Sequence, residues 1–115
     1  MKIGIDIEEI ERFKNKTVEN DSHFLERIFT EKEISYCFSK TKPAQHLCAR
    51  FCAKEAVIKA LSDKTLELNE IEILNNEDGK PLIRLPEKYK TLIIDVSISH
   101  CKKYACANVL LYQKN

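Results

Sequence analysis

PAQHLCARFCAKEAVIKAL, residues 43–61, is the stretch that decides the fold. Its opening proline suits the first turn of a helix, where an amide hydrogen would have no partner in any case. The residues that follow place apolar side chains on nearly every side of a helix that ends at about Leu61. A helix of this composition belongs at the centre of a domain, so we expect other elements to cover it from several sides.

Strands are predicted on both sides of this helix along the chain. Residues 2–8 alternate, with isoleucine at every second position, which is typical of a short half-buried strand. Residues 71–74 and 81–85 enclose one polar turn, and residues 92–99 and 104–112 enclose another. Each arrangement predicts a hairpin of two antiparallel strands.

Two shorter helices are expected between the first strand and the long helix. Thr30 followed by Glu33 forms a capping box that opens one of them. Asp21 or Ser22 can cap an earlier one, after a polar loop over residues 14–21. The predicted fold class is therefore α+β, with an antiparallel sheet packed against a long central helix and shorter helices.

The composition limits the kind of protein this can be. The chain has 115 residues, 19 Lys and Arg against 18 Asp and Glu, and 43% hydrophobic residues. This length predicts one domain over residues 1–115, and the hydrophobic fraction excludes a disordered chain. A net charge of +1 argues against a general nucleic-acid binder. No apolar run is long enough to cross a membrane, and five cysteines without a CxxC pair are typical of a cytoplasmic protein with reduced thiols.

Charged residues interrupt the long helix on two sides. His46, Arg50 and Lys54 cluster on one side, which we interpret as the solvated face. Glu55 and Lys59 fall on another side among small apolar residues, with the spacing and order that favour an ion pair. Two interpretations remain open: an ion pair at the edge of the core, or a carboxylate and an ammonium in a partly dry cleft. A carboxylate in such a cleft needs a metal ion or another cation as its partner.

Asp6 lies where the first strand turns into a helix, so it can cap that helix or bind a metal ion. Asp6 and Glu55 together, without a supporting His or Cys, would favour a hard cation such as Mg²⁺.

Ser99 and His100 end a predicted strand, where a hydroxyl and an imidazole suit phosphate contacts and equally suit a turn. With two glycines in the chain, a glycine-rich phosphate cradle cannot be built.

Five short motifs, in order between Ile3 and Leu111, resemble those of the holo-acyl-carrier-protein synthase family, the short group of 4′-phosphopantetheinyl transferases. The most diagnostic is RFCAKEAVIKA from Arg50, which is similar to the family's Arg-Phe-x-x-Lys-Glu-Ala-x-x-Lys. The other four are the Gly-x-Asp opening at Gly4, the Phe-Thr-x-x-Glu stretch at Phe29, Gly79-Lys80-Pro81, and Ser97-Ile98-Ser99-His100.

The resemblance implies the 4′-phosphopantetheinyl transferase fold and an activity. The family transfers phosphopantetheine from coenzyme A to a serine of an apo acyl carrier protein, releasing 3′,5′-ADP, in support of fatty acid synthesis. The serine hydroxyl must lose a proton, to Glu55 or to a water molecule on the metal ion. Carried over to this sequence, the resemblance makes Asp6 and Glu55 the Mg²⁺ ligands, Glu55 and Lys59 the catalytic residues, and Arg50, Lys59, Pro81, Ser99 and His100 the coenzyme A contacts.

The resemblance also implies partners. Acyl carrier proteins are usually acidic, and Arg12 and Arg27 are the expected docking residues for one. The short members of the family are trimers with active sites between subunits, so a homotrimer is expected. Neither a nucleic acid nor a membrane is expected as a partner.

The chain departs from the family pattern in the loop that follows the long helix. Most members carry a Gly-Thr-Gly type loop after the long helix, whereas this chain has Ser62-Asp63-Lys64-Thr65. Side chains of this loop would have to replace the usual backbone contacts to phosphate.

Two alternative functions stay open. One is a Mg²⁺-dependent hydrolase of a nucleotide pyrophosphate, which would use the same carboxylates on water. The other is a non-catalytic α+β binding module in which Glu55 and Lys59 are structural.

Overall fold

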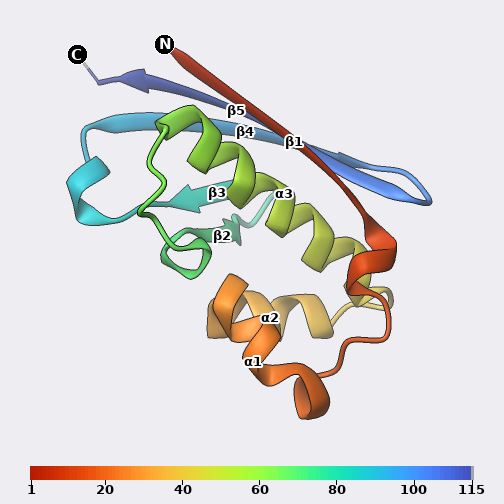
Figure 1. Ribbon diagram of the computed structural model, residues 1–115. Helices are drawn as coiled ribbons and strands as arrows, with labels where there is room; N and C mark the ends of the chain where they lie inside the picture. The colour runs from red at the N-terminus through yellow and green to blue at the C-terminus, as the bar shows by residue number, and fades with distance from the viewer. Residues whose placement is uncertain (115) are drawn as a thin grey trace.

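The long helix runs through the middle of the molecule, as the sequence predicts (Figure 1). The computed structural model describes residues 1–114. A three-stranded sheet covers one side of helix α3, and the shorter helix α2 and a two-stranded sheet pack on other sides. None of the helices in this part of the chain is long and apolar enough to cross a bilayer. The elements are β1 (Lys2–Glu9), α1 (Val18–Ile28), α2 (Glu31–Phe38), α3 (Pro43–Leu61), β2 (Glu72–Asn75), β3 (Pro81–Arg84), β4 (Leu92–His100) and β5 (Tyr104–Gln113), with short 3-10 helices η1 (Ile10–Phe13), η2 (Leu68–Glu70) and η3 (Glu87–Tyr89).

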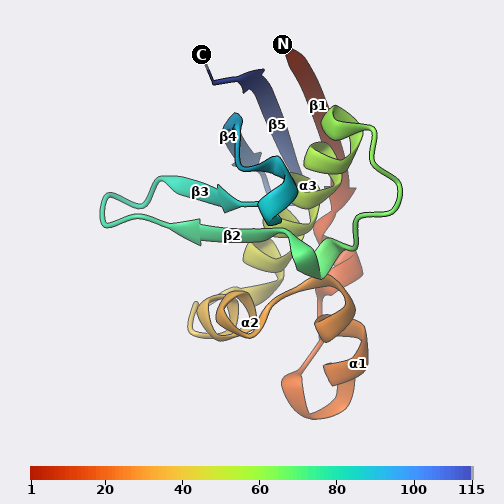
Figure 2. The same cartoon turned by 90° about the vertical axis from the view of Figure 1, so that its left-hand side faces the viewer.

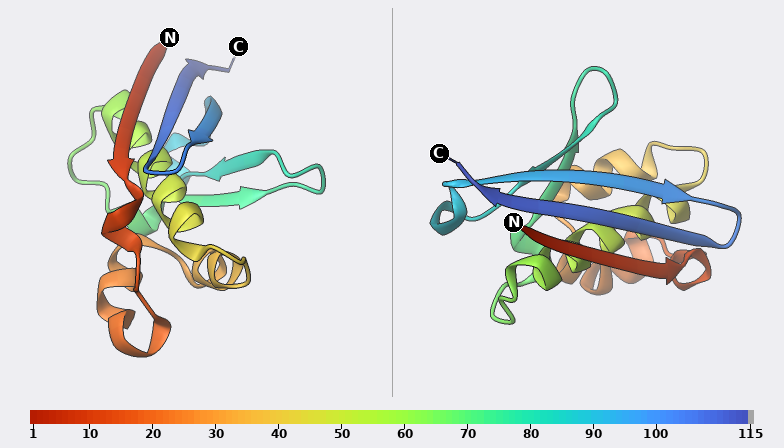
Figure 3. Two further views of the ribbon diagram at one scale, coloured as in Figure 1. Left: turned by 90° about the vertical axis from the view of Figure 1, so that its right-hand side faces the viewer. Right: turned by 90° about the horizontal axis from the view of Figure 1, so that it is seen from above.

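Both predicted hairpins are present, and they belong to different sheets. Strands β4 and β5 pair with β1 in the order β1-β5-β4, all antiparallel, and lie side by side over α3 (Figure 3). Strands β2 and β3 form a separate hairpin that projects from the body of the molecule (Figure 2). The predicted α+β class, with an antiparallel sheet on a long helix, is confirmed.

Strand β1 is half-buried as predicted, and its buried side is the one that carries Gly4. The isoleucines at positions 3, 5 and 7 on the other side are 72%, 59% and 65% exposed. A side chain at Gly4 would overlap the carbonyl oxygen of Ala56, so glycine is what lets the strand lie directly on α3. The alternation of the strand then turns Asp6 and Glu8 toward the same helix.

The predicted solvated face of α3 is wrong, because Arg50 is 5% exposed and Lys54 is fully buried. The Lys54 ammonium donates to Glu33 at 2.5 Å and to the carbonyl oxygens of Ile28 at 2.7 Å and Leu68 at 3.1 Å. These partners come from α1, α2 and η2, which pack against this side of the helix. A buried ammonium is tolerable only with such a full set of acceptors.

The short helices begin partly as predicted. The capping box of α2 is confirmed: the Thr30 hydroxyl accepts from the Glu33 amide and the Glu33 carboxylate accepts from the Thr30 amide. Helix α1 begins earlier than expected, at Val18, because Thr17 accepts a hydrogen bond from the Asn20 amide at 3.1 Å. Asp21, a predicted cap, lies inside α1 at a kink, with a non-helical φ of −125°.

Candidate active site

Asp6, Glu55 and Lys59 come together where β1 crosses α3, and we call them the carboxylate cluster. The Lys59 ammonium donates to an Asp6 carboxylate oxygen at 3.0 Å and to the Ile5 carbonyl oxygen at 3.0 Å. Of the two interpretations of Glu55 and Lys59, the ion pair between them is not formed: within residues 1–114 the carboxylate paired with Lys59 is that of Asp6. The pair links residues 53 positions apart in the sequence, which local spacing cannot reveal.

The cluster carries more negative charge than its lysine neutralises. Burial raises the pKa of Glu55, and the negative charge of Asp6 raises it further. The positive charges of Lys59 and Arg12 act in the opposite direction and only partly offset these effects. Arg12 itself donates to Glu8 at 2.8 Å and lies over the Phe51 ring, 4.7 Å from its centroid. The site is thus suited to a further cation.

Two thiols lie beneath this cluster. Cys48 and Cys52 are fully buried and donate to the carbonyl oxygens of Glu8 and Ala105. Within residues 1–114, no three side chains of His, Cys, Asp or Glu are grouped to hold a metal ion. A cation beside Asp6 and Glu55 would therefore complete its shell with water or ligand oxygens, which is the usual behaviour of Mg²⁺.

Arg50 lines a second site, a cavity of about 410 Å³ that we call the arginine pocket. Its walls come from α2, α3, the β2–β3 hairpin and β4. Arg50 donates to the Asn75 side chain at 2.5 Å, and its guanidinium lies 4.2 Å from the centroid of the Tyr36 ring. The lining residues are Tyr36, Gln45, His46, Ala49, Arg50, Ile73, Asn75, Gly79, Pro81, Val96, Ser97, Ile98 and His100.

Three of the predicted coenzyme A contacts, Arg50, Pro81 and His100, thus meet in one cavity. Ser99 does not line it. This residue is exposed, whereas Val96 and Ile98 on the other face of β4 pack against the core. The pocket also contains Tyr36, His46 and Asn75, which were not predicted from the sequence. The helical pattern assigns His46, with Arg50, to a solvated face of the helix.

The loop that departs from the family begins with Ser62 in the left-handed region, at φ 57°. This conformation favours glycine, the residue that the family resemblance implies for the start of this loop. The Asp63 carboxylate accepts hydrogen bonds from Thr65, Tyr89 and Lys88, which hold the pKa of Asp63 well below its usual range. Asp63 therefore ties the loop to η3, and Ser62, Lys64 and Thr65 remain exposed.

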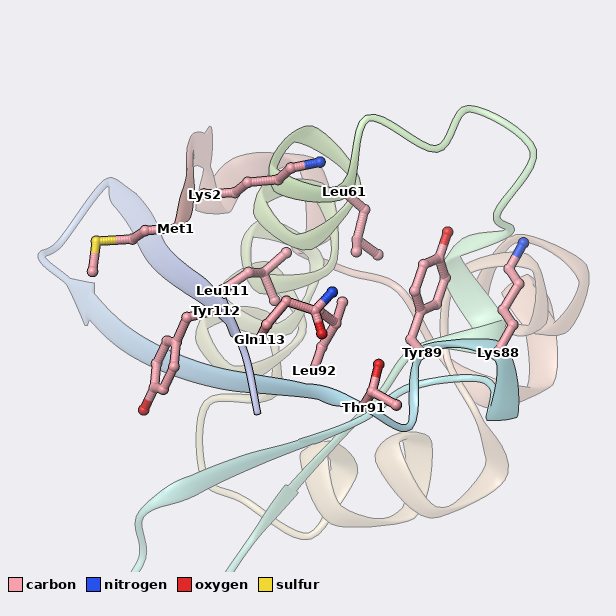
Figure 4. A pocket seen from close by; sticks show the side chains of 10 residues that line it. All are labelled: Met1, Lys2, Leu61, Lys88, Tyr89, Thr91, Leu92, Leu111, Tyr112 and Gln113. Atoms are coloured by element: carbon pink, nitrogen blue, oxygen red, sulfur yellow. The ribbon is translucent and has the colours of Figure 1, made fainter. Parts of the chain in front are cut away.

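Another cavity, of about 270 Å³, lies between the end of α3, η3 and the ends of the sheet strands (Figure 4). Its walls include Leu61, Tyr89 and Leu111, and none of the predicted site residues lines it. The predicted docking residues Arg12 and Arg27 are both exposed, on η1 and in the last turn of α1.

Known proteins match this chain over nearly its whole length. The sequence profile of the 4′-phosphopantetheinyl transferase superfamily matches residues 2–109. A holo-[acyl-carrier-protein] synthase from Thermodesulfovibrio yellowstonii is 48% identical over 110 residues, covering 95% of this chain and 96% of that protein.

Solved structures share the fold over nearly the whole chain. The holo-(acyl-carrier-protein) synthase of Bacillus anthracis, in complex with CoA (3′,5′-ADP), has a TM-score of 0.81 and 32% identity, covering 99% of this chain and 96% of that one. The Helicobacter pylori enzyme in complex with coenzyme A has a TM-score of 0.82 and 32% identity, covering 96% of this chain and 99% of that one. The family resemblance seen in the motifs is confirmed: the chain belongs to the 4′-phosphopantetheinyl transferase superfamily, among the holo-[acyl-carrier-protein] synthases.

Proposed function

We propose that this protein transfers the 4′-phosphopantetheine arm of coenzyme A to a serine of an apo acyl carrier protein, leaving 3′,5′-ADP. The observation that carries the proposal is the carboxylate cluster, in which β1 delivers Asp6 to Lys59 and Glu55 of the family's diagnostic helix. Five free thiols and a coenzyme A substrate suit the reducing cytoplasm, where we propose that it acts.

Asp6 and Glu55 fit Mg²⁺, because both offer oxygen donors and together hold uncompensated negative charge. The ion would neutralise the charge of the pyrophosphate and of the departing ADP oxygen. Lys59 lies at the same place and stabilises that developing charge as an ammonium. Glu55 is our candidate for the base that accepts the proton of the serine hydroxyl, since the pKa of its carboxyl is raised.

The nucleotide part of coenzyme A is assigned to the arginine pocket, with Arg50, Pro81 and His100 as contacts. This pocket lies beside β4, whereas the carboxylate cluster lies beside β1, and β5 separates these two strands. A site divided between the two edges of one sheet is completed most simply by two copies of the chain. Ser99, on the outer face of β4, remains a predicted contact within such an assembly.

A homotrimer is the proposed assembly, and the isoleucine face of β1 is its proposed interface. Ile5→Asp should dissociate it, because a carboxylate would be buried without a partner against the next copy. Analytical ultracentrifugation should show three chains for the wild type and for Leu82→Asp, whose exposed leucine lies on β3, and one chain for Ile5→Asp. A wild-type protein of one chain, or an Ile5→Asp variant that stays assembled, would contradict this interface.

Arg12 and Arg27 are the proposed docking residues for the acidic carrier. Arg12→Glu should raise the KM for the carrier about tenfold and the KM for coenzyme A far less, because the charge lies outside the arginine pocket. Steady-state kinetics with each substrate varied in turn measures both constants. Equal effects on the two constants would count against docking at Arg12.

One assay tests the function itself. The protein is mixed with apo acyl carrier protein, coenzyme A and Mg²⁺, and the mass of the carrier is measured by mass spectrometry. A gain of one phosphopantetheine arm is expected. Cleavage of the pyrophosphate without carrier would instead indicate a hydrolase, and the absence of both reactions would indicate a binding module.

A further inference from the structure

The arginine pocket gathers basic side chains around a buried guanidinium. Arg50 is 5% exposed, and within residues 1–114 it forms no ion pair with a carboxylate. Its Nε atom is buried and has no hydrogen-bond partner in that part of the chain. Burying a cation without a carboxylate partner costs free energy, so the pocket is suited to bind an anion from outside the chain.

His46 belongs to the same cationic wall. It precedes Arg50 by one turn of α3, and the two residues contact the same aromatic ring. The Tyr36 ring lies 4.2 Å from the Arg50 guanidinium and meets the His46 ring edge-on, with ring centroids 5.9 Å apart. Lys40 lies over the Tyr36 ring as well, at 4.6 Å. The Tyr36 ring therefore contacts three basic side chains, those of Lys40, His46 and Arg50.

The groups that face His46 come from every element around it. They are Tyr36 of α2, Lys40 after α2, Arg50 of α3 and His100 of β4, and no carboxylate is among the residues that line the pocket. Burial lowers the pKa of His46, and the charges of Arg50, Lys40 and His100 lower it further. The free pocket thus keeps this imidazole neutral to a lower pH than usual.

We propose that His46 is a second phosphate-binding imidazole opposite His100, and that the pocket takes up a proton there when it binds the 3′-phosphate of coenzyme A. This inference rests on the proposed function, because it assumes that the pocket receives the nucleotide. A phosphate monoester is mainly a dianion above about pH 6. Its charge offsets the repulsion among Arg50, Lys40 and the imidazoles, so the protonated form of His46 is favoured in the complex.

The sign of the pH effect follows from this. A group whose pKa is higher in the complex than in the free protein strengthens binding at low pH, and this contribution is lost as pH rises through the pKa in the complex. Coenzyme A should therefore bind roughly fivefold more weakly at pH 8.5 than at pH 6.5 on account of His46 alone. Dephospho-coenzyme A, which lacks the 3′-phosphate, should show little of this dependence.

The test is isothermal titration calorimetry of coenzyme A and dephospho-coenzyme A at pH 7 in two buffers of different ionisation enthalpy. The difference in heat gives the number of protons taken up. Uptake should be clear for coenzyme A, small for dephospho-coenzyme A, and reduced by His46→Gln. His46→Lys, which stays charged, should bind coenzyme A with a flatter pH dependence and without the affinity lost in His46→Gln. His23→Gln, an exposed histidine on α1, is the matched control and should behave as the wild type.

Equal proton uptake in the wild type and His46→Gln would overturn this inference, as would equal uptake with the two ligands. Transfer to the carrier, measured on the wild type at saturating coenzyme A, tests the proposed function separately. If transfer occurs while uptake is independent of His46, only the role of His46 fails. If coenzyme A does not bind at all, the proposed function fails with it.

Discussion

Glu55→Gln is expected to lower the rate of carrier modification by roughly 10² to 10⁴-fold. Glutamine keeps the size of the side chain, but it cannot accept the serine proton and is a weaker ligand for a cation. Because Glu55 is only half-buried and forms no ion pair within residues 1–114, the variant should fold normally. Mass spectrometry of the carrier gives the rate, and thermal unfolding monitored by circular dichroism checks the fold.

Glu87→Gln is the matched control for that experiment. Its side chain is 86% exposed on η3, far in sequence from the carboxylate cluster, so its activity should equal that of the wild type. Near-normal activity of Glu55→Gln would remove Glu55 from the chemistry. Loss of activity together with loss of the thermal transition would mean that Glu55 is required for folding instead.

Lys54→Met is expected to lower the free energy of unfolding by about 3–5 kcal/mol. The change leaves the Glu33 carboxylate fully buried without its cation, although the amides of Thr30 and Ile73 still donate to it. Burial lowers the pKa of Lys54 despite this partner, which indicates that the ion pair does not fully replace hydration. Urea unfolding of each variant measures the loss.

The double variant Lys54→Met/Glu33→Gln distinguishes the loss of the ion pair from the loss of the packing of the lysine side chain. It removes both charges, so it should be more stable than Lys54→Met alone, and the double-mutant cycle gives the coupling energy. Lys14→Met provides a surface comparison, because the pair of Lys14 with Glu11 is exposed and should contribute little. If Lys54→Met were no more destabilising than Lys14→Met, the buried pair would have no special role in stability.

Local patterns in the sequence predicted the elements well. The long helix, the capping box at Thr30 and Glu33, and both hairpins depend on residues that are neighbours along the chain. The periodicity failed at Lys54, because a helical pattern assigns charged residues to water. The acceptors that bury this lysine come from distant segments that the pattern does not include.

The site was predictable only in part for the same reason. Helical spacing paired Lys59 with Glu55, whereas the folded chain pairs it with Asp6 on β1. The family motifs named Asp6, Glu55 and Lys59 without showing how they meet. Gly4 supplies the reason, since its missing side chain allows β1 to contact α3 and brings Asp6 to the cluster. His46 had no signal of its own, because its role depends on Tyr36 and on β4.

Strand β1 presents Asp6 to α3 on one face and isoleucines to the exterior on the other. The alternation of a strand fixes both faces together, since a shift by one residue would exchange them. If the isoleucines are covered by another copy of the chain, the strand that positions Asp6 is held by that contact as well. Specific activity would then depend on protein concentration: dilution below the dissociation constant of the assembly would lower turnover per chain by mass action, with no change in the sequence.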